Sequence, residues 1–234
     1  ECLRIVKKRT TAVIITSDKA YKNIETKKGY KENDVLKGDD PYGASKSSAD
    51  IAISSYYHSY FSKKNSKVLI SIARAGNVIG GGDWSEGRII PDLIRAWQQK
   101  SILEIRSGSA TRPWQHVLEP LSGYLALGYK LNDSSLNVNG AFNFGPGLTK
   151  DIAVSQLVIE MGKHLPELNY EIVGTSEGAF HEAGLLRLNC DKAANILEWK
   201  PTLNFSEENK YQYGPLLCLR CKISSYITYS VKNL

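Results

Sequence analysis

The sequence predicts an α/β protein built on a parallel sheet, followed by a smaller lobe of mixed α and β segments. Two buried-strand patterns, at residues 11–16 and 67–73, flank a long helical pattern at residues 42–61. The order strand, helix, strand indicates a right-handed parallel crossover. The β-branched run at residues 11–16 is typical of a strand that is buried on both faces.

Turn and capping residues divide the rest of the chain into shorter predicted elements. Residues 4–8 have the pattern of a helix end, and Pro41 precedes the long helix. We expect Asp191 to cap a short final helix that ends by residue 198. Periodicity also predicts helices at residues 90–99, 120–131 and 151–164, the last capped by Thr149, and short strands at residues 103–106, 114–118 and 141–144.

Composition excludes several classes of protein. The chain has 234 residues, of which 42% are hydrophobic and 23% charged, so it is long enough to bury a core. No apolar run approaches the ~20 residues that span a bilayer, and the net charge of +6 is spread over many short groups, which disfavours a nucleic-acid partner. The four cysteines are scattered, and the pair Cys218 and Cys221 lacks the companions of a metal site. We therefore expect a cytoplasmic protein with no membrane segment and no metal.

The helical segment PYGASKSSAD contains a Y-x-x-x-K pair, Tyr42 and Lys46. Residues four apart share a helix face, so the phenol and the ammonium are expected side by side. Free tyrosine has a pKa near ~10, and a tyrosine that acts as a base near neutrality needs a pKa lower by ~3. A neighbouring cation supplies part of that change. By itself, however, this spacing occurs often by chance.

The apolar run VIITSDKAYKN ends in a hydroxyl, an acid and an amine: Ser17, Asp18 and Lys19. Open parallel sheets bind ligands outside the carboxyl ends of their strands. The triplet would therefore reach the same crevice as the helix that carries Tyr42 and Lys46. The alternative is a polar turn that simply ends a strand.

Long motifs in one order resemble a known family. TSDKAY, PYGASK, RAGNVIGGGDW, GRIIPDLIRAW, RPWQHVLEPLSGYL and HEA followed by LRLNCDKA are similar to extended short-chain dehydrogenase/reductases, and among these to the sugar-nucleotide 4,6-dehydratases that act on CDP-glucose. The resemblance covers residues 13–201. In dTDP-glucose relatives the triplet is usually Thr-Asp-Glu, and Lys19 in the glutamate position points to the CDP-glucose branch.

The resemblance implies a partial Rossmann-type doubly wound parallel sheet with a smaller mixed α/β substrate-binding lobe. Residues 1–80 would form the carboxyl-terminal part of a dinucleotide-binding domain. Residues 81–207 would form mainly the sugar-nucleotide lobe, with returning segments of the first domain. Residues 208–234 are an atypical tail for which the sequence suggests no function.

The resemblance also implies roles in an NAD-dependent reaction. Tyr42 would take the proton of the sugar's C4 hydroxyl while hydride passes to NAD, and Lys46 would favour the phenolate and hold the nicotinamide ribose. Ser17 would hydrogen-bond the C4 oxygen. Asp18 would protonate the hydroxyl that leaves C6. Lys19 stands in the position of the C5 base, a role that an ammonium can fill only when deprotonated or through another group. The product would be CDP-4-dehydro-6-deoxyglucose, used in deoxysugar biosynthesis.

Four further residues are expected near the nucleotide sugar. Arg112 is the best match for its diphosphate, because arginine forms charge-assisted bonds to phosphate. Asn77 and Arg88 would lie near the nucleotide sugar, and Glu182 near the nucleotide end. The alternatives are surface cations for the arginines and a turn cap for Asn77. Family members commonly pair through the Tyr–Lys helix, so a homodimer is also expected.

One family feature is absent from the 234 residues. No G-x-x-G-x-x-G or G-x-G-x-x-G motif for the pyrophosphate of NAD occurs, and the triple glycine at residues 80–82 follows the Tyr–Lys helix. We therefore expect this chain to be inactive or impaired alone. We also expect the strands at residues 13–16 and 67–73 to lose sheet neighbours and leave an edge prone to aggregation. The alternatives are a non-catalytic remnant, a sugar-nucleotide-binding module, or another extended dehydratase or epimerase of the same family.

Overall fold

A computed structural model describes residues 1–63, 65–133, 138–147, 152–174 and 184–203. The chain divides into two compact units. The first unit comprises the described parts of residues 1–78, 110–152 and 181–202, and the second comprises those of residues 79–109, 153–180 and 203–234. The predicted tail at 208–234 lies outside the described residues.

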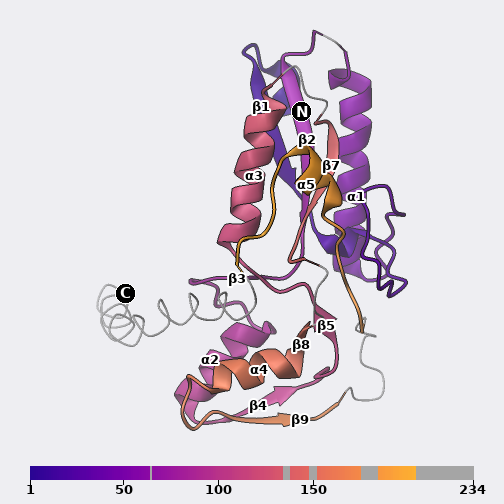
Figure 1. Cartoon of the computed structure of the whole chain (residues 1–234). Coiled ribbons are helices and arrows are strands. Elements are labelled where there is room, and N and C mark those ends of the chain that lie inside the picture. Colours follow the sequence, from indigo (N-terminus) through magenta and orange to yellow (C-terminus); the bar gives the residue numbers. More distant parts are fainter. Residues whose placement is uncertain (64, 134–137, 148–151, 175–183, 204–234) are drawn as a thin grey trace, which may run out of the picture. The chain divides into compact units, whose positions relative to one another are not determined.

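The first unit is built on a three-stranded parallel sheet, as the sequence predicts. Its strands are β1 (Thr10–Ile15), β2 (Val68–Ala75) and β7 (Gly140–Phe144), in the spatial order β1-β2-β7 (Figure 1). In the register, Ile14 of β1 lies opposite Ile72 of β2. The α/β class and the parallel crossover are therefore confirmed.

The long helix predicted over residues 42–61 is also confirmed. It forms α1 (Pro41–Tyr56) and continues into a π-helical turn, η3 (Tyr57–Phe61). Asp40 Oδ1 caps the helix by accepting a hydrogen bond of 2.9 Å from the Gly43 amide. Pro41 occupies the first helical position, where its missing N–H costs nothing.

Helices cover both faces of this sheet. Alternate residues of a strand point to opposite faces, so β2 contributes to two separate cores. Helix α1 packs over the face that carries Ile70, whereas α3 (Leu118–Leu131) and α5 (Asp191–Ile196) pack over the face that carries Ala73. The second core includes the fully buried side chains of Leu127, Phe142, Phe144 and Ala193.

The two longest strands differ in burial. β2 is buried along nearly its whole length, which matches the expectation for a strand covered on both faces. β1 is only half-buried, and the Ile15 side chain is exposed. Within the described residues, β1 forms a ladder with β2 alone, so its other edge has no neighbouring strand. The prediction of a fully buried strand was therefore wrong for β1. The predicted loss of sheet neighbours was wrong for residues 67–73, because β2 pairs with β1 on one side and with β7 on the other.

The second unit has a small core between helices and a two-stranded parallel sheet. Its helices are α2 (Ile89–Gln99) and α4 (Val154–Gly162), and its strands are β4 (Ile102–Ile105) and β9 (Asn169–Ile172). The buried side chains at its centre are those of Leu93, Ile94, Leu103, Ile105, Val158 and Met161.

Several short elements complete the fold. They are η1 (Cys2–Ile5), η2 (Asp18–Ala20), β3 (Val78–Ile79), β5 (Thr111–Arg112), β6 (Gln115–His116) and β8 (Ile152–Ala153). The strand predicted at 114–118 is reduced to β6, because α3 already begins at Leu118. No helix in the described part of the chain is long and apolar enough to cross a membrane.

Two predicted helix starts were wrong. The helix predicted from residue 151 begins at Val154, and its proposed cap Thr149 lies outside the described residues. Asp191 is the first residue of α5 rather than its cap. Instead, Asn189 Oδ1 accepts a hydrogen bond of 3.0 Å from the Asp191 amide, so an asparagine two residues earlier supplies the acceptor.

Candidate active site

The Ser17–Asp18–Lys19 triplet forms a tight turn directly after β1. Ser17 has an extended backbone and caps the 3₁₀ turn η2, where its Oγ accepts a hydrogen bond of 3.2 Å from the Lys19 amide. The Ala20 amide donates to the Ser17 carbonyl over 3.2 Å. A serine cap therefore bends the chain as soon as the strand ends and fixes the three side chains on one short turn.

Asp18 is a buried carboxyl with one unpartnered oxygen. Its side chain is 3% exposed, and Oδ1 accepts a hydrogen bond of 3.0 Å from the Ser17 hydroxyl. Oδ2 has no hydrogen-bond partner among the described residues. Burial raises the pKa of Asp18 to about 6, although the Ser17 hydrogen bond and the charges of Lys19 and Arg112 act in the opposite direction. Such a group can hold and release a proton near neutrality.

Tyr42 and Lys46 lie in the first turns of α1. The Lys46 Nζ is 5.4 Å from the centroid of the Tyr42 ring, as their spacing on one helix face predicts. The Tyr42 side chain is 52% exposed, whereas Lys46 is half-buried. The phenol is therefore open to a ligand and has a cation beside it.

The triplet and the Tyr–Lys helix are in direct contact. A Cβ built on Gly43, the residue after Tyr42, would lie only 2.9 Å from the Lys19 carbonyl oxygen. One turn further on, the Ser47 hydroxyl donates to the Ala20 carbonyl over 2.8 Å. The absence of a side chain at Gly43 lets α1 approach the η2 turn closely, which brings the triplet beside the Tyr–Lys pair.

The predicted substrate residues are distributed over both units. Arg112 is buried in β5, close enough to Asp18 for its charge to lower the pKa of that carboxyl. Asn77 is half-buried, and its carbonyl accepts a hydrogen bond of 3.0 Å from the Gln115 amide. Arg88 belongs to the second unit, where its Nε lies 3.7 Å from Asp83 Oδ2.

Glu182 lies outside the described residues. Among the three predicted substrate residues that the structure describes, Arg112 is the one whose charge acts on the Asp18 carboxyl.

Three residues that sequence reasoning did not single out also belong to this region. Gly43 provides the close approach described above. Tyr124 of α3 is largely buried, which raises its pKa to about 12, and the charge of Asp18 acts in the same direction. Gln115 is completely buried, and its Oε1 has no hydrogen-bond partner among the described residues. All three lie within the quoted motifs, but spacing alone assigns them no chemistry.

Comparison with known protein families and sequences gives a consistent result. Residues 1–210 match the family described as GDP-mannose 4,6 dehydratase. The chain is 39% identical over 202 residues to a CDP-glucose 4,6-dehydratase of Salmonella typhimurium. That match covers 83% of this chain but 55% of the Salmonella protein, so the chain spans about half of its relative's length.

Solved structures with the same fold are more distant in sequence. An epimerase from Methanothermobacter thermautotrophicus has a TM-score of 0.77 at 20% identity, covering 95% of this chain and 63% of that one. A dTDP-glucose 4,6-dehydratase from Bacillus anthracis, solved in complex with NAD, has a TM-score of 0.70 at 20% identity, covering 86% and 59%. These likenesses establish the fold.

Proposed function

Because the chain belongs to the GDP-mannose 4,6 dehydratase family, we propose that it carries the catalytic residues of a sugar-nucleotide 4,6-dehydratase whose substrate is CDP-glucose. The observation that supports this most strongly is the contact of the Ser17–Lys19 turn with the first turn of α1 at Gly43. The 39% identity to the Salmonella CDP-glucose enzyme supports the choice of nucleotide sugar.

In this proposal Tyr42 acts on the C4 hydroxyl of the sugar. As a phenolate, the exposed Tyr42 side chain would accept the hydroxyl proton, with the Lys46 ammonium as the neighbouring cation 5.4 Å from the ring centroid. The Ser17 hydroxyl, which donates to Asp18 Oδ1 in this structure, would turn to the C4 oxygen of a bound substrate and donate a hydrogen bond there as charge develops. The three groups would thus orient and deprotonate the C4 hydroxyl, and NAD, when bound, would accept the hydride.

Asp18 supplies the proton for loss of water. Its raised pKa, about 6, keeps a useful fraction of the carboxyl protonated near neutrality, so it can protonate the hydroxyl that leaves C6. Lys19 is half-buried at the adjacent position and stands where the C5 base of the family is expected. We propose that it removes the C5 proton when deprotonated or directs another group that does so.

The residues present fit one end of an NAD molecule. An exposed phenol and an ammonium on one helix face can together hydrogen-bond the two hydroxyls of the nicotinamide ribose. When bound, NAD would supply the acceptor and later the donor of hydride. The glycine motif that holds its pyrophosphate is absent from the 234 residues. We therefore propose that this chain alone is inactive or impaired as an enzyme.

The remaining assignments follow the same proposal. Arg112 would bind the diphosphate, because a guanidinium group forms charge-assisted hydrogen bonds to phosphate oxygens. Asn77, Arg88 and Glu182 would bind other parts of the nucleotide sugar. On family grounds we also propose a cytoplasmic location and a homodimer.

A second function is favoured by the missing glycine motif. The chain would then bind a nucleotide sugar without turning it over, as a non-catalytic remnant or binding module.

Calorimetry with CDP-glucose and with NAD, followed by absorbance of the 4-keto product, separates these functions. For an impaired dehydratase, both ligands bind and product forms slowly, and Tyr42→Phe abolishes product formation while CDP-glucose still binds. For a binding module, CDP-glucose binds without NAD binding or product. Absence of CDP-glucose binding, with another nucleotide sugar bound instead, would overturn the choice of substrate.

A further inference from the structure

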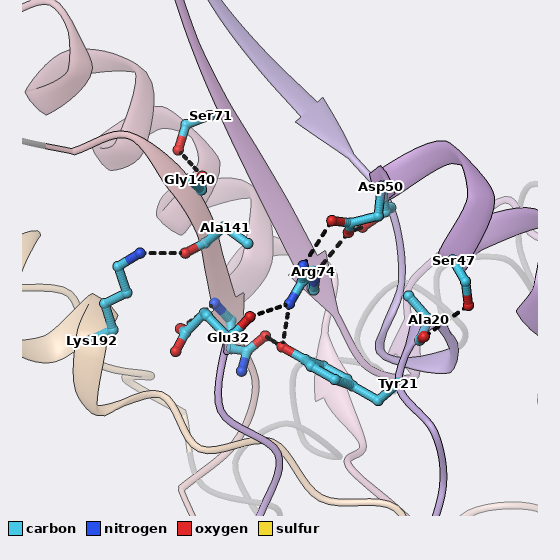
Figure 2. A network of polar contacts seen from close by, with 12 residues as sticks. Ala20, Tyr21, Glu32, Ser47, Asp50, Ser71, Arg74, Gly140, Ala141 and Lys192 are labelled. Atoms are coloured by element: carbon cyan, nitrogen blue, oxygen red, sulfur yellow. Dashed lines mark hydrogen bonds and ion pairs between the residues drawn. The ribbon is translucent and has the colours of Figure 1, made fainter. Parts of the chain in front are cut away.

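A network of buried polar side chains lies beside the candidate site, and the proposed chemistry does not use it (Figure 2). Its centre is Asp50 of α1, two helical turns beyond Tyr42 and completely buried. The two Asp50 oxygens accept hydrogen bonds from Arg74 Nε over 2.8 Å and from Arg74 Nη2 over 2.7 Å. The Thr16 hydroxyl donates a third bond to Asp50 Oδ2 over 3.0 Å. Thr16 is the residue immediately before Ser17.

The other side of the Arg74 guanidinium reaches the far end of the same turn. Arg74 Nη1 donates to the Tyr21 hydroxyl over 2.7 Å and to the Glu32 carbonyl over 3.0 Å. Figure 2 shows Arg74 between Asp50 on one side and Tyr21 on the other. The Tyr21 hydroxyl in turn donates to Asn143 Oδ1 over 2.7 Å. Tyr21 follows Lys19 by two residues.

The Asp50–Arg74 ion pair is therefore hydrogen-bonded to Thr16 before the triplet and to Tyr21 after it. We propose that Asp50 and Arg74 are positioning residues, which hold the Ser17–Lys19 turn against the helix that carries Tyr42 and Lys46. Asp50 and Tyr42 belong to the same helix, so the bond from Thr16 to Asp50 ties the strand end directly to the Tyr–Lys helix. The kinetic part of this inference rests on the proposed function.

A positioning role accounts for the presence of an ion pair in the core and for the full set of hydrogen bonds around it. Well-packed apolar side chains are often as stabilising as a buried ion pair, so stability alone does not require Arg74 and Asp50. Fully hydrogen-bonded buried networks are rigid and fix one arrangement of the groups that they join. Catalysis needs that rigidity, because a misplacement of ~1 Å can lower a rate by ~10²-fold.

The sharpest test is Thr16→Val, since substitution of Asp50 leaves a buried charge and endangers the fold. Valine keeps the shape of threonine but removes the hydroxyl that reaches Asp50. Tyr21→Phe releases the other end of the turn independently. Ser71→Ala is the matched control: it removes a buried hydroxyl from β2 that donates to the Gly140 carbonyl over 2.6 Å and has no bond to the turn.

Hydrogen exchange of the whole chain reports the position of the turn without requiring turnover. The amides of Lys19, Ala20 and Tyr21 are bonded within the turn. Thr16→Val and Tyr21→Phe should speed their exchange by roughly tenfold while β2 amides keep their rates, because only local opening becomes easier. Ser71→Ala should leave the turn amides unchanged. Thr16→Ser, which restores the hydroxyl, should restore slow exchange.

Kinetics of product formation on the same variants test the consequence for catalysis. Thr16→Val should lower kcat by roughly tenfold with little change in KM, and Thr16→Ser should recover it. Unchanged exchange at the turn, or faster exchange with an unchanged kcat, would overturn the inference. If the unsubstituted chain forms no product, that result matches the inactivity proposed for the chain alone, whereas absence of CDP-glucose binding would count against the proposed function. In either case the exchange rates decide the positioning role.

Discussion

Asp18 and Asp50 are two buried carboxyl groups in the same part of the first unit, and their surroundings differ sharply. Asp50 accepts three hydrogen bonds, two of them from the Arg74 guanidinium. Asp18 accepts one from Ser17, and its Oδ2 has no partner among the described residues. The comparison separates a carboxylate that forms an ion pair with a buried guanidinium from a carboxyl whose pKa is raised by burial.

The difference follows from the cost of burying a negative charge. Arg74 lies 2.7 Å from Asp50 and compensates that cost by direct contact. For Asp18, the charges of Lys19 and Arg112 lower the pKa, but burial outweighs them and raises it to about 6. The first arrangement suits a group that holds structure, and the second suits a group that transfers a proton.

The largest expected effect comes from breaking the Asp50 pair. Asp50→Leu leaves the Arg74 guanidinium buried without its carboxylate, so the free energy of unfolding should fall by roughly 3–5 kcal/mol. Urea denaturation at pH 7 measures this change. The double variant Asp50→Leu/Arg74→Met should recover most of the loss, because no buried charge remains. A single-variant loss below about 1 kcal/mol would show that Arg74 finds other compensation.

Substitution of Asp18 should increase the free energy of unfolding at neutral pH, whereas substitution of Asp50 should decrease it. The folded-state pKa, about 6, lies above the ordinary value of 3.8, so the folded protein binds this proton more tightly than the unfolded chain. The associated stability is complete below pH ~4 and is lost as the pH rises through 6. Asp18→Asn should therefore match the unsubstituted protein at low pH and be more stable by up to roughly 3 kcal/mol at pH 7.

Urea denaturation of both proteins between pH 3.5 and pH 7.5 tests this prediction. Parallel stability curves would mean that Asp18 is not destabilised by burial. The same substitution removes the proposed proton donor, so product formation should fall by at least about 10²-fold. A gain in stability together with a loss of activity would distinguish Asp18 from Asp50.

A smaller effect on the free energy of unfolding is expected from Gly43, where α1, the helix that carries Asp50, contacts the turn that carries Asp18. Gly43→Ala places a methyl group 2.9 Å from the Lys19 carbonyl, so α1 or the turn must shift, at a cost of roughly 1–3 kcal/mol. Gly128→Ala is the control on α3, where the nearest atom, Val13 Cγ2, lies at an ordinary 3.6 Å. It should stabilise the protein by roughly 0.5–1 kcal/mol. Equal effects at both glycines in urea denaturation would argue against a close contact at Gly43.

The sequence predicts one of these two carboxyl groups and not the other. The alternation of strand and helix indicates the parallel sheet, and the position of Asp18 at a strand end indicates a role at its crevice. Asp50 also follows Tyr42 at helical spacing, but nothing in the sequence pairs it with Arg74. That pairing depends on how α1 packs against β2, and the spacing of residues along one helix does not specify this packing. The unpartnered Oδ2 of Asp18 is likewise a property of tertiary packing.

The smallest effect concerns the hydrogen bond that Asp18 does have. The Ser17 hydroxyl donates to Asp18 Oδ1 over 3.0 Å and lowers the pKa of that carboxyl. Ser17→Ala should therefore raise the pKa of Asp18 above 6, by somewhat less than one pH unit, because a neutral hydrogen bond contributes about 1 kcal/mol. An NMR titration of the Asp18 carboxyl carbon measures the change. Ser47→Ala is the control, because Ser47 bonds the Ala20 carbonyl of the same turn and makes no bond to Asp18. A lower pKa in Ser17→Ala would indicate that water enters in place of the hydroxyl, and Asp18 would then owe its proton affinity to the exclusion of water by Ser17.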